Sequence, residues 1–240
     1  MDFDGKHVLV TGGALRIGAA ICRAFAGAGA RVTIHCRNSK AQAEALAAGL
    51  PGTGHAVACA DFSSGAEGAR TLWNRLASPV DILVNNASCY RLPEELAGLY
   101  EPVNFLAPVE LMELFSRQEL VEGAVVNVVD QAALNPFHCE EERYVESRRK
   151  LAGATREFAL RYAENNLRFN AVAPGPVLPP PGLENSKMEK TLRHVPLRRP
   201  VLLDDLVAAV LFLAGCSSIT GAVLPVDCGS SLTSFLREKK

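Results

Sequence analysis

The chain has 240 residues, of which 48% are hydrophobic and 21% are charged, and its formal net charge is −1. This composition is typical of a globular protein, and the near-zero net charge excludes a strong field that would attract nucleic acid or an anionic membrane surface. The seven cysteines are scattered without a C-x-x-C pair, which indicates reduced thiols in a cytoplasmic protein, and the five histidines lack the spacing of a metal site.

Membrane insertion is not expected either. The amino terminus, MDFDGKH, has no apolar signal region. The longest apolar run, residues 206–216, is too short to cross a bilayer and follows two aspartates, so it predicts a buried core helix.

Apolar runs that predict strands alternate with segments that predict helices along the whole chain. The first strand is expected at 7–11, and a glycine turn and an apolar helix connect it to a second strand at 31–36. The remaining strands are expected at 55–60, 81–86, 124–129, 167–172 and 222–227, and the remaining helices near 39–49, 64–77, 103–117, 143–165 and 204–215. Strands that are apolar on both faces predict a doubly wound α/β fold, with about seven parallel strands covered by helices on each side.

One change of composition interrupts this alternation. Residues 174–190, PGPVLPPPGLENSKMEK, are rich in proline and polar residues and predict a long loop near the end of a strand. Ligands bind at strand ends in open α/β sheets, so we expect a substrate loop around 174–195. The alternative is a surface excursion without a ligand.

A glycine turn, TGGALRIG at 11–18, lies between the first strand and the first helix. Gly12 and Gly18 allow the backbone to approach a pyrophosphate, and the helix amino terminus offers unpaired N–H groups. Arg16 stands where a middle glycine is common in such turns. The position of this turn after the first strand favours a dinucleotide-binding site. The alternative is a tight turn that binds no ligand.

The end of the second strand indicates which dinucleotide binds. A site for NAD usually has an acidic residue there, but the segment 34–40, IHCRNSK, has none. Cys36 is near the expected place of the acid, and Arg37, Asn38 and Ser39 follow it. A 2′-phosphate needs a cation and hydroxyl or amide donors, so NADPH is favoured over NADH. The alternative is a solvated basic loop.

Taken together and in order, several stretches resemble the short-chain dehydrogenase/reductase family. They are TGGALRIG, ADF at 60–62, LVNNAS at 83–88, PLRRP at 196–200 and ITGAVLPVDCG at 219–229. The resemblance covers essentially the whole chain. It implies a single doubly wound domain over 1–240 that assembles as a homotetramer or homodimer.

Within that family the sequence is most similar to the pteridine reductases and dihydromonapterin reductases. The features that carry this similarity are Arg16 in the glycine turn, His35, Asn38 and Ser39 after the second strand, Ser88 in place of the last glycine of N-N-A-G, Tyr90, and Asp130 in place of a serine. The resemblance implies that Tyr90 stacks on a flat pterin and that Arg16 contacts both phosphate and substrate.

These motifs and the resemblance give two sets of expected contacts. The residues expected to bind the cofactor are Gly12, Arg16, Ile17, Gly18, His35, Arg37, Asn38, Ser39, Asp61, Phe62, Asn85, Ala87, Ser88, Tyr144, Arg148, Pro174 and Gly175. The residues expected to bind the substrate are Arg16, Ser88, Tyr90, Asp130 and Tyr144.

Residues 143–150, RYVESRRK, resemble the family's catalytic Y-x-x-x-K helix, with Tyr144 as the tyrosine and Arg148 at the lysine position. Residues one turn apart share a helix face, so Arg148 keeps a positive charge beside Tyr144. A guanidinium cannot give up its proton, however, so it cannot relay protons as a lysine does. Lys150 cannot substitute because six residues along a helix point away from Tyr144. The glutamates at 140–142 would raise the tyrosine pKa if they face it.

Two further residues complete the expected catalytic set. Asp130 precedes Tyr144 by fourteen residues, about one more than the family usually shows, and suits a substrate with N–H donors or a proton relay to a ring nitrogen. The alternative is a solvated loop residue. Asn104 matches the asparagine that holds a water chain below the family's lysine. Equally, it could be a polar residue that kinks its helix through a local bond.

Three functions remain open on this sequence. The first is an NADPH-dependent reductase of a pterin-like C=N bond, acting on a dihydropterin or dihydrofolate ring with Tyr144 as proton donor. The second is a carbonyl or oxoacyl reductase of the same family, against which the replacement of serine by Asp130 counts. The third is a catalytically weak NADPH-binding sensor or scaffold, because Arg148 replaces the lysine.

Overall fold

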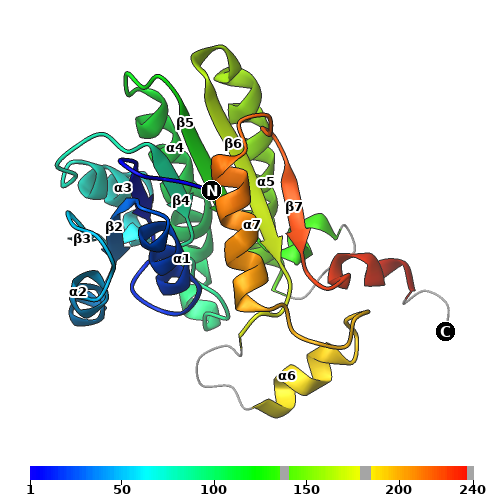
Figure 1. Cartoon of the computed structure of the whole chain (residues 1–240). Coiled ribbons are helices and arrows are strands. Elements are labelled where there is room, and N and C mark those ends of the chain that lie inside the picture. The colour runs from blue at the N-terminus through cyan, green and yellow to red at the C-terminus, as the bar shows by residue number, and fades with distance from the viewer. Residues whose placement is uncertain (136–140, 179–184, 237–240) are drawn as a thin grey trace.

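A parallel sheet of seven strands forms the centre of the molecule (Figure 1). The computed structural model describes residues 1–135, 141–178 and 185–236. Its strands are β1 His7–Val10, β2 Arg31–Cys36, β3 Ala56–Cys59, β4 Ile82–Asn85, β5 Gly123–Val128, β6 Leu167–Pro174 and β7 Val223–Val226. Every pair of neighbouring strands is parallel. The predicted Rossmann-type α/β fold is confirmed.

The strand order places a crevice at the middle of the sheet. The order is β3-β2-β1-β4-β5-β6-β7, so the chain moves outward from β1 in one direction and then restarts beside β1 with β4. Val10 at the end of β1 pairs with Val84 near the end of β4. Loops that leave these two strands diverge, and ligands of doubly wound sheets bind in the space between them.

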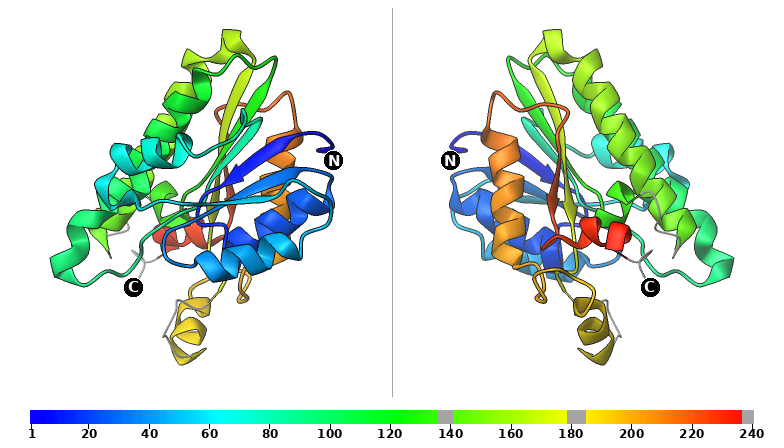
Figure 2. Two further views of the ribbon diagram at one scale, coloured as in Figure 1. Left: turned by 90° about the vertical axis from the view of Figure 1, so that its left-hand side faces the viewer. Right: turned by 90° about the vertical axis from the view of Figure 1, so that its right-hand side faces the viewer.

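Helices cover both faces of the sheet (Figure 2). One layer contains α1 Arg16–Gly27, α2 Lys40–Ala48 and α7 Leu203–Gly215, and the other contains α3 Ala66–Trp73, α4 Ala107–Ser116 and α5 Glu142–Arg161. Each layer buries its own apolar core against the sheet. This explains why the strands are apolar on both faces.

Two segments differ from the prediction. The expected helix at 103–117 begins with a π-helical turn, Pro102–Leu106, and becomes regular only in α4. The predicted loop at 174–195 contains a helix, α6 Asn185–Leu192, which lies beyond the carboxyl ends of the strands (Figure 1). Past the prolines the sequence consists mostly of good helix formers, which explains α6. Residues 179–184 of this loop lie outside the described part of the chain.

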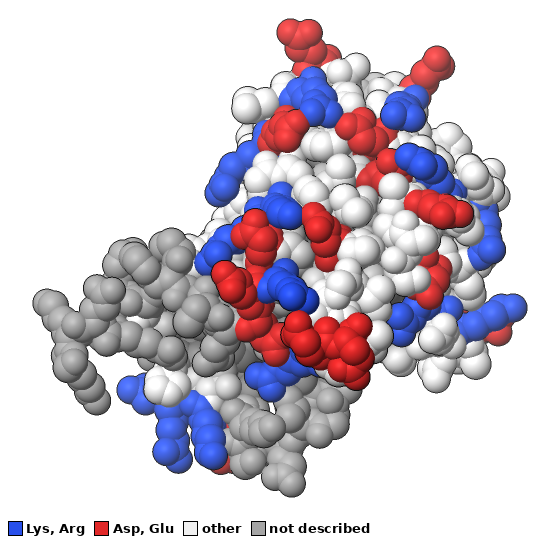
Figure 3. Space-filling view, turned by 180° about the vertical axis from the view of Figure 1, so that it is seen from behind, with Lys and Arg blue, Asp and Glu red and all other residues white. Residues whose placement is uncertain are grey.

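The outer face of the α3–α5 layer carries acidic and basic side chains in alternation (Figure 3). Three of its ion pairs join Arg70 to Glu110, Arg161 to Glu113 and Lys150 to Glu101, at 2.7–2.8 Å. Lys150 is therefore engaged on the surface, away from Tyr144, as the helical spacing predicted. Among the described residues, no helix is long and apolar enough to span a membrane.

Candidate active site

The glycine turn after β1 is packed too closely to accept side chains. Gly12 has a φ of +61°, and a Cβ on it would lie 2.9 Å from the Cα of Ala87. A Cβ on Gly18 would lie 2.2 Å from the carbonyl oxygen of Gly12. The helix α1 that follows has no side-chain hydrogen bond at its amino cap, Leu15. This helix end, without a side-chain cap, can offer backbone N–H groups to an anion such as a pyrophosphate.

Thr11 and Asn86 lock the turn to the end of β4. The Asn86 side-chain amide donates to the carbonyl oxygens of Thr11 at 2.9 Å and Gly12 at 3.1 Å. In return, the Thr11 hydroxyl oxygen accepts from the backbone N–H groups of Asn86 and Ala87. Neither residue was predicted from the sequence, although Asn86 is the second asparagine of the LVNNAS motif.

Asn85 lies elsewhere than predicted. It is 1% exposed, and its amide donates to Asn127 at 2.8 Å inside the sheet. Asn127 in turn donates to the Thr155 hydroxyl on α5 at 2.9 Å. Side chains alternate between the two faces of a strand, so only one of two adjacent asparagines can reach the crevice. Asn85 therefore ties β4 to β5 and α5, and Asn86 supports the glycine turn.

His35, which was expected to bind the cofactor, supports the glycine turn from the interior of the protein. Its Nδ1 accepts from the Gly12 N–H at 3.2 Å, so its Nε2 carries the proton and donates to the Ala60 carbonyl at 3.1 Å. The ring stacks on Phe62 with centroids 4.4 Å apart, and His35 is 2% exposed. Burial lowers the pKa of His35 to about 4, so the imidazole stays neutral and holds the turn.

The basic segment after β2 lies at the rim. Arg37 and Asn38 are exposed, and Ser39 precedes α2. Cys36, which has the expected place of an acid, is buried, and its sulfur lies 3.4 Å from that of Cys59. Burial raises the pKa of Cys36 to about 12, so this position carries no negative charge that would repel a phosphate.

The remaining predicted cofactor residues lie at neighbouring strand ends. Asp61 accepts from the Ser63 N–H at 2.9 Å, after β3. Pro174 ends β6, and a Cβ on Gly175 would lie 2.8 Å from the Cα of Asp227, so the chain passes close to the end of β7 there. Ile17, by contrast, lies in the first turn of α1 and packs against the core.

Tyr144 and Asp130 meet at the end of β5. The Tyr144 hydroxyl donates to one carboxylate oxygen of Asp130 at 2.9 Å. The other oxygen of Asp130 accepts from the Ala132 N–H at 2.8 Å, at the start of the 3₁₀ turn Gln131–Leu134. Asp130 is thus fixed by a cap, and its carboxylate is half-buried and faces the tyrosine.

The pKa of Tyr144 is raised well above its usual range. Burial is the main cause, and the negative charge of Asp130 adds to it. The charge of Arg148 and a hydrogen bond from it act in the opposite direction. Tyr144 is consequently a protonated phenol at neutral pH, which suits a proton donor.

Arg148 lies on the same helix face as Tyr144, with its guanidinium carbon 5.4 Å from the centre of the tyrosine ring. It is 2% exposed. Its Nε and Nη1 atoms are buried and have no hydrogen-bond partner within the described residues. Unpaired buried donors are costly, so these two N–H groups indicate a missing acceptor such as a ribose hydroxyl.

Asn104 holds the loop that follows β4. Its side-chain oxygen accepts from the Cys89 N–H at 2.9 Å, and its amide donates to the Cys89 carbonyl at 3.0 Å. The amide also lies 3.3 Å from the Ser147 hydroxyl on α5. The residue sits in the π-helical turn, but its bonds reach the loop after β4 and helix α5, so they are not the local bonds of the alternative, and its role below the Arg148 position stays a prediction.

Tyr90 lies at the solvent-exposed edge of the site. Its ring is 42% exposed and lies 4.7 Å from the Tyr144 ring, at an angle of 55°. Ser88 and Arg16 are also exposed, and Arg16 begins α1 with a φ of +53°. The predicted substrate residues Tyr90, Asp130 and Tyr144 therefore form one cluster, with Ser88 two residues from Tyr90 in the same loop.

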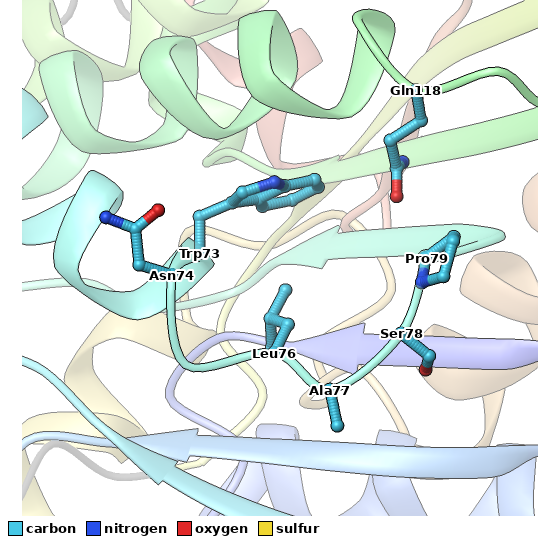
Figure 4. A pocket seen from close by; sticks show the side chains of 7 residues that line it. All are labelled: Trp73, Asn74, Leu76, Ala77, Ser78, Pro79 and Gln118. Atoms are coloured by element: carbon cyan, nitrogen blue, oxygen red, sulfur yellow. The ribbon is translucent and has the colours of Figure 1, made fainter.

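A cavity of about 360 Å³ lies on the other side of the molecule (Figure 4). Trp73, Pro79 and Gln118 line it, below the amino ends of the strands. The Gln118 side chain donates to the Val80 and Phe115 carbonyls and accepts from the Val80 N–H. The residues that line this cavity, which include Asn74 and Ser78, carry no acidic, basic or thiol group, so it offers no chemistry comparable to the Tyr144 cluster.

The sheet order, the glycine turn and the buried tyrosine on α5 define a dinucleotide-binding oxidoreductase of the Rossmann type. The family model described as "Enoyl-(Acyl carrier protein) reductase" matches residues 13–231. The chain belongs to the short-chain dehydrogenase/reductase family.

By their names, the proteins similar to this chain act on two kinds of substrate. L-xylulose reductase from Caenorhabditis elegans is 31% identical, over 96% of this chain and 97% of its own. Among solved structures, FolM alternative dihydrofolate reductase 1 from Brucella canis, complexed with NADP, is 32% identical with a TM-score of 0.85 and covers 96% of this chain and 95% of its own. The same enzyme from Brucella suis, also with NADP, is 33% identical with a TM-score of 0.84, over 95% and 96%.

Proposed function

We propose that this protein is an NADPH-dependent reductase that reduces a C=N bond of a dihydropterin or dihydrofolate ring. Tyr144 is the proton donor, and Asp130 replaces the serine of related carbonyl reductases. The observation that carries the proposal is the hydrogen bond from Tyr144 to Asp130 beside the exposed ring of Tyr90. The likeness to the two FolM structures supports it.

The residues of the crevice fit NADPH. The glycine turn and the amino terminus of α1 would hold the pyrophosphate, and Arg37, Asn38 and Ser39 would hold the 2′-phosphate. The unpaired Nε and Nη1 of Arg148 would donate to ribose hydroxyls. When bound, NADPH supplies the hydride.

The chemistry of Asp130 favours a ring with N–H groups over a ketone. An ionised carboxylate only accepts hydrogen bonds, and Asp130 already accepts from Tyr144 and Ala132. It would repel a ketone oxygen but can accept from an N–H donor on a pterin ring. Tyr144 keeps its proton at neutral pH and can deliver it as negative charge develops on the substrate nitrogen.

A second candidate is reduction of a sugar ketone. The similarity to L-xylulose reductase, over nearly the full length of both chains, favours it. This reading needs Asp130 to do the work of a serine hydroxyl, which donates to the carbonyl oxygen. A catalytically silent NADPH sensor remains the third candidate because of Arg148.

One experiment separates the three. NADPH binding is first measured by titration, and NADPH oxidation is then followed with dihydrobiopterin, dihydrofolate, L-xylulose and a simple ketoester. Turnover with the pterins is expected. Turnover with the ketones alone would establish the second candidate, and tight binding without any turnover would establish the third.

A further inference from the structure

The ring of Tyr90 touches a cation as well as the proton donor. The guanidinium carbon of Arg91 lies 5.3 Å from the centre of the Tyr90 ring, and its Nε donates to the Tyr90 hydroxyl at 3.1 Å. Tyr90 in turn lies 4.7 Å from Tyr144. An exposed positive charge is thus attached to the aromatic surface on which a flat substrate would stack.

The backbone at Arg91 is in an unusual conformation. Its φ is +52°, in the left-handed region, which costs a residue with a side chain on the order of 1 kcal/mol. Glycine or asparagine would adopt this conformation more easily. An arginine here turns the chain so that its own guanidinium lies over the neighbouring ring.

Two further cations act on the start of this loop. Burial raises the pKa of Cys89, next to Tyr90, and the charges of Arg148 and Arg37 lower it. Two carboxylates of the site accept hydrogen bonds from phenols, Asp130 from Tyr144 and Glu141 from Tyr100. Arg37 and Arg148 are the cations proposed above for the cofactor, whereas Arg91 lies on the ring proposed for the substrate.

We propose that Arg91 determines specificity by binding a carboxylate that the substrate carries beyond its flat ring. The inference rests on the proposed function and deepens it: the favoured substrate is a dihydropterin with an anionic tail, of the dihydrofolate type, over a pterin with a neutral side chain. A guanidinium binds a carboxylate through two parallel N–H bonds, and its attraction acts only on the charged tail.

The test compares dihydrofolate with dihydrobiopterin, whose side chain is uncharged. In Arg91→Gln, which keeps side-chain donors but removes the charge, KM for dihydrofolate rises about tenfold and kcat stays within about twofold. KM for dihydrobiopterin changes less than about twofold. Arg91→Lys gives an intermediate KM for dihydrofolate. Arg75→Ala, an exposed arginine beyond the end of α3, changes neither KM.

Salt provides a readout that needs no variant. Raising ionic strength increases KM for dihydrofolate in the natural protein, and the increase disappears in Arg91→Gln. Equal effects of the substitution on both substrates, or a KM for dihydrofolate that ignores both salt and substitution, would overturn the role of Arg91. Failure of the natural protein to reduce either dihydrobiopterin or dihydrofolate would instead refute the proposed pterin reductase, and the inference with it.

Discussion

The Tyr144 hydroxyl donates a hydrogen bond to Asp130 at 2.9 Å, and the Asp130 carboxylate is held in place by the Ala132 N–H. This pair favours reduction. Burial and the carboxylate together raise the tyrosine pKa, so the phenol is protonated and can act as a proton donor. To protonate a substrate the hydroxyl must leave Asp130, which costs about 1.5–3 kcal/mol unless the substrate supplies a replacement donor to the carboxylate.

Replacing Tyr144 with phenylalanine removes the proposed proton donor and little volume. We expect kcat to fall by about 10²–10⁴, with NADPH affinity unchanged within about threefold, because the ring still fills its place. Steady-state rates with dihydrobiopterin and a cofactor titration measure the two effects. Tyr162→Phe, at the far end of α5, loses hydrogen bonds with Glu113 and Arg161 away from the site and should retain activity. Full activity of Tyr144→Phe would exclude this mechanism.

Replacing Asp130 with asparagine removes one cause of the raised tyrosine pKa. The carboxylate charge raises the pKa of Tyr144, so its loss lowers that pKa. Loss of the donor proton then begins at lower pH than in the natural protein, although burial, the larger cause, still keeps the pKa raised. A kcat profile carried to the highest pH at which the fold persists, together with tyrosinate absorbance, measures the shift. An unchanged alkaline limb would mean that Tyr144 is not the group that titrates.

Asp130→Ser tests the choice of substrate. A serine hydroxyl can donate to a carbonyl oxygen, whereas the carboxylate cannot. We expect pterin reduction to weaken and ketone reduction to appear or increase, measured as the ratio of kcat/KM values for dihydrobiopterin and L-xylulose. If the natural protein already prefers L-xylulose and Asp130→Ser loses that activity, the carboxylate itself serves the ketone, and the pterin reading is wrong.

The sequence predicted the sheet because each strand is a short apolar run between turn residues, a pattern that tertiary contacts do not override. It also predicted that Asp130, Tyr144 and Tyr90 belong to one site. The sequence pointed to Asn85 and not to Asn86 as the residue at the cofactor. Which of the two side chains faces the crevice depends on where β4 ends. The sequence could not place His35 beneath the turn either, because burial and the two hydrogen bonds of its ring arise only when β1, β2 and β3 align.

Arg148 is expected to support Tyr144 by charge and to hold the cofactor by its unpaired N–H groups. Arg148→Met should raise KM or Kd for NADPH and lower kcat by about tenfold or more, because the cation that opposes the raised tyrosine pKa is lost. Arg148→Lys should retain activity near neutral pH. A buried lysine can lose its proton as pH rises, whereas arginine does not. The alkaline limit of activity should therefore lie at a lower pH in this variant than in the natural protein.

The control for Arg148 is Arg156→Met, an exposed position on the same helix, which should change neither parameter. A natural protein that binds NADPH but is inactive, together with an active Arg148→Lys variant, would establish the sensor reading. Circular dichroism and thermal unfolding of each variant distinguish loss of function from loss of fold.

Acid should destabilise the site through His35. Its pKa is lowered to about 4 in the folded protein, against an ordinary value of about 6.5, so the unfolded chain takes up a proton first as pH falls. The stability from this group is complete above about pH 6.5 and is lost as pH falls towards 4, by about 2 kcal/mol between pH 7 and pH 5. Urea unfolding at several pH values measures it.

His35→Gln stays neutral at every pH and should give a shallower dependence of unfolding free energy on pH, at a lower stability near pH 8. His7 also has a pKa lowered by burial, so part of the acid sensitivity persists. His194→Gln, at an exposed position, should keep the full dependence. If His35→Gln and the natural protein respond identically to acid, His35 is not a neutral brace of the glycine turn.

Cofactor choice should depend on Arg37, because the segment after β2 has a cation, an amide and a hydroxyl where an acid would bind ribose. Arg37→Ala loses a charge-assisted contact to the 2′-phosphate, so its affinity for NADPH should fall about tenfold or more while its affinity for NADH stays within about twofold. Fluorescence titrations with both cofactors measure the ratio. Arg75→Ala serves again as the distant control. If NADH binds as tightly as NADPH in the natural protein, this segment is only a solvated basic loop. If Arg37→Ala loses equal affinity for both cofactors, the guanidinium contacts the pyrophosphate instead of the 2′-phosphate.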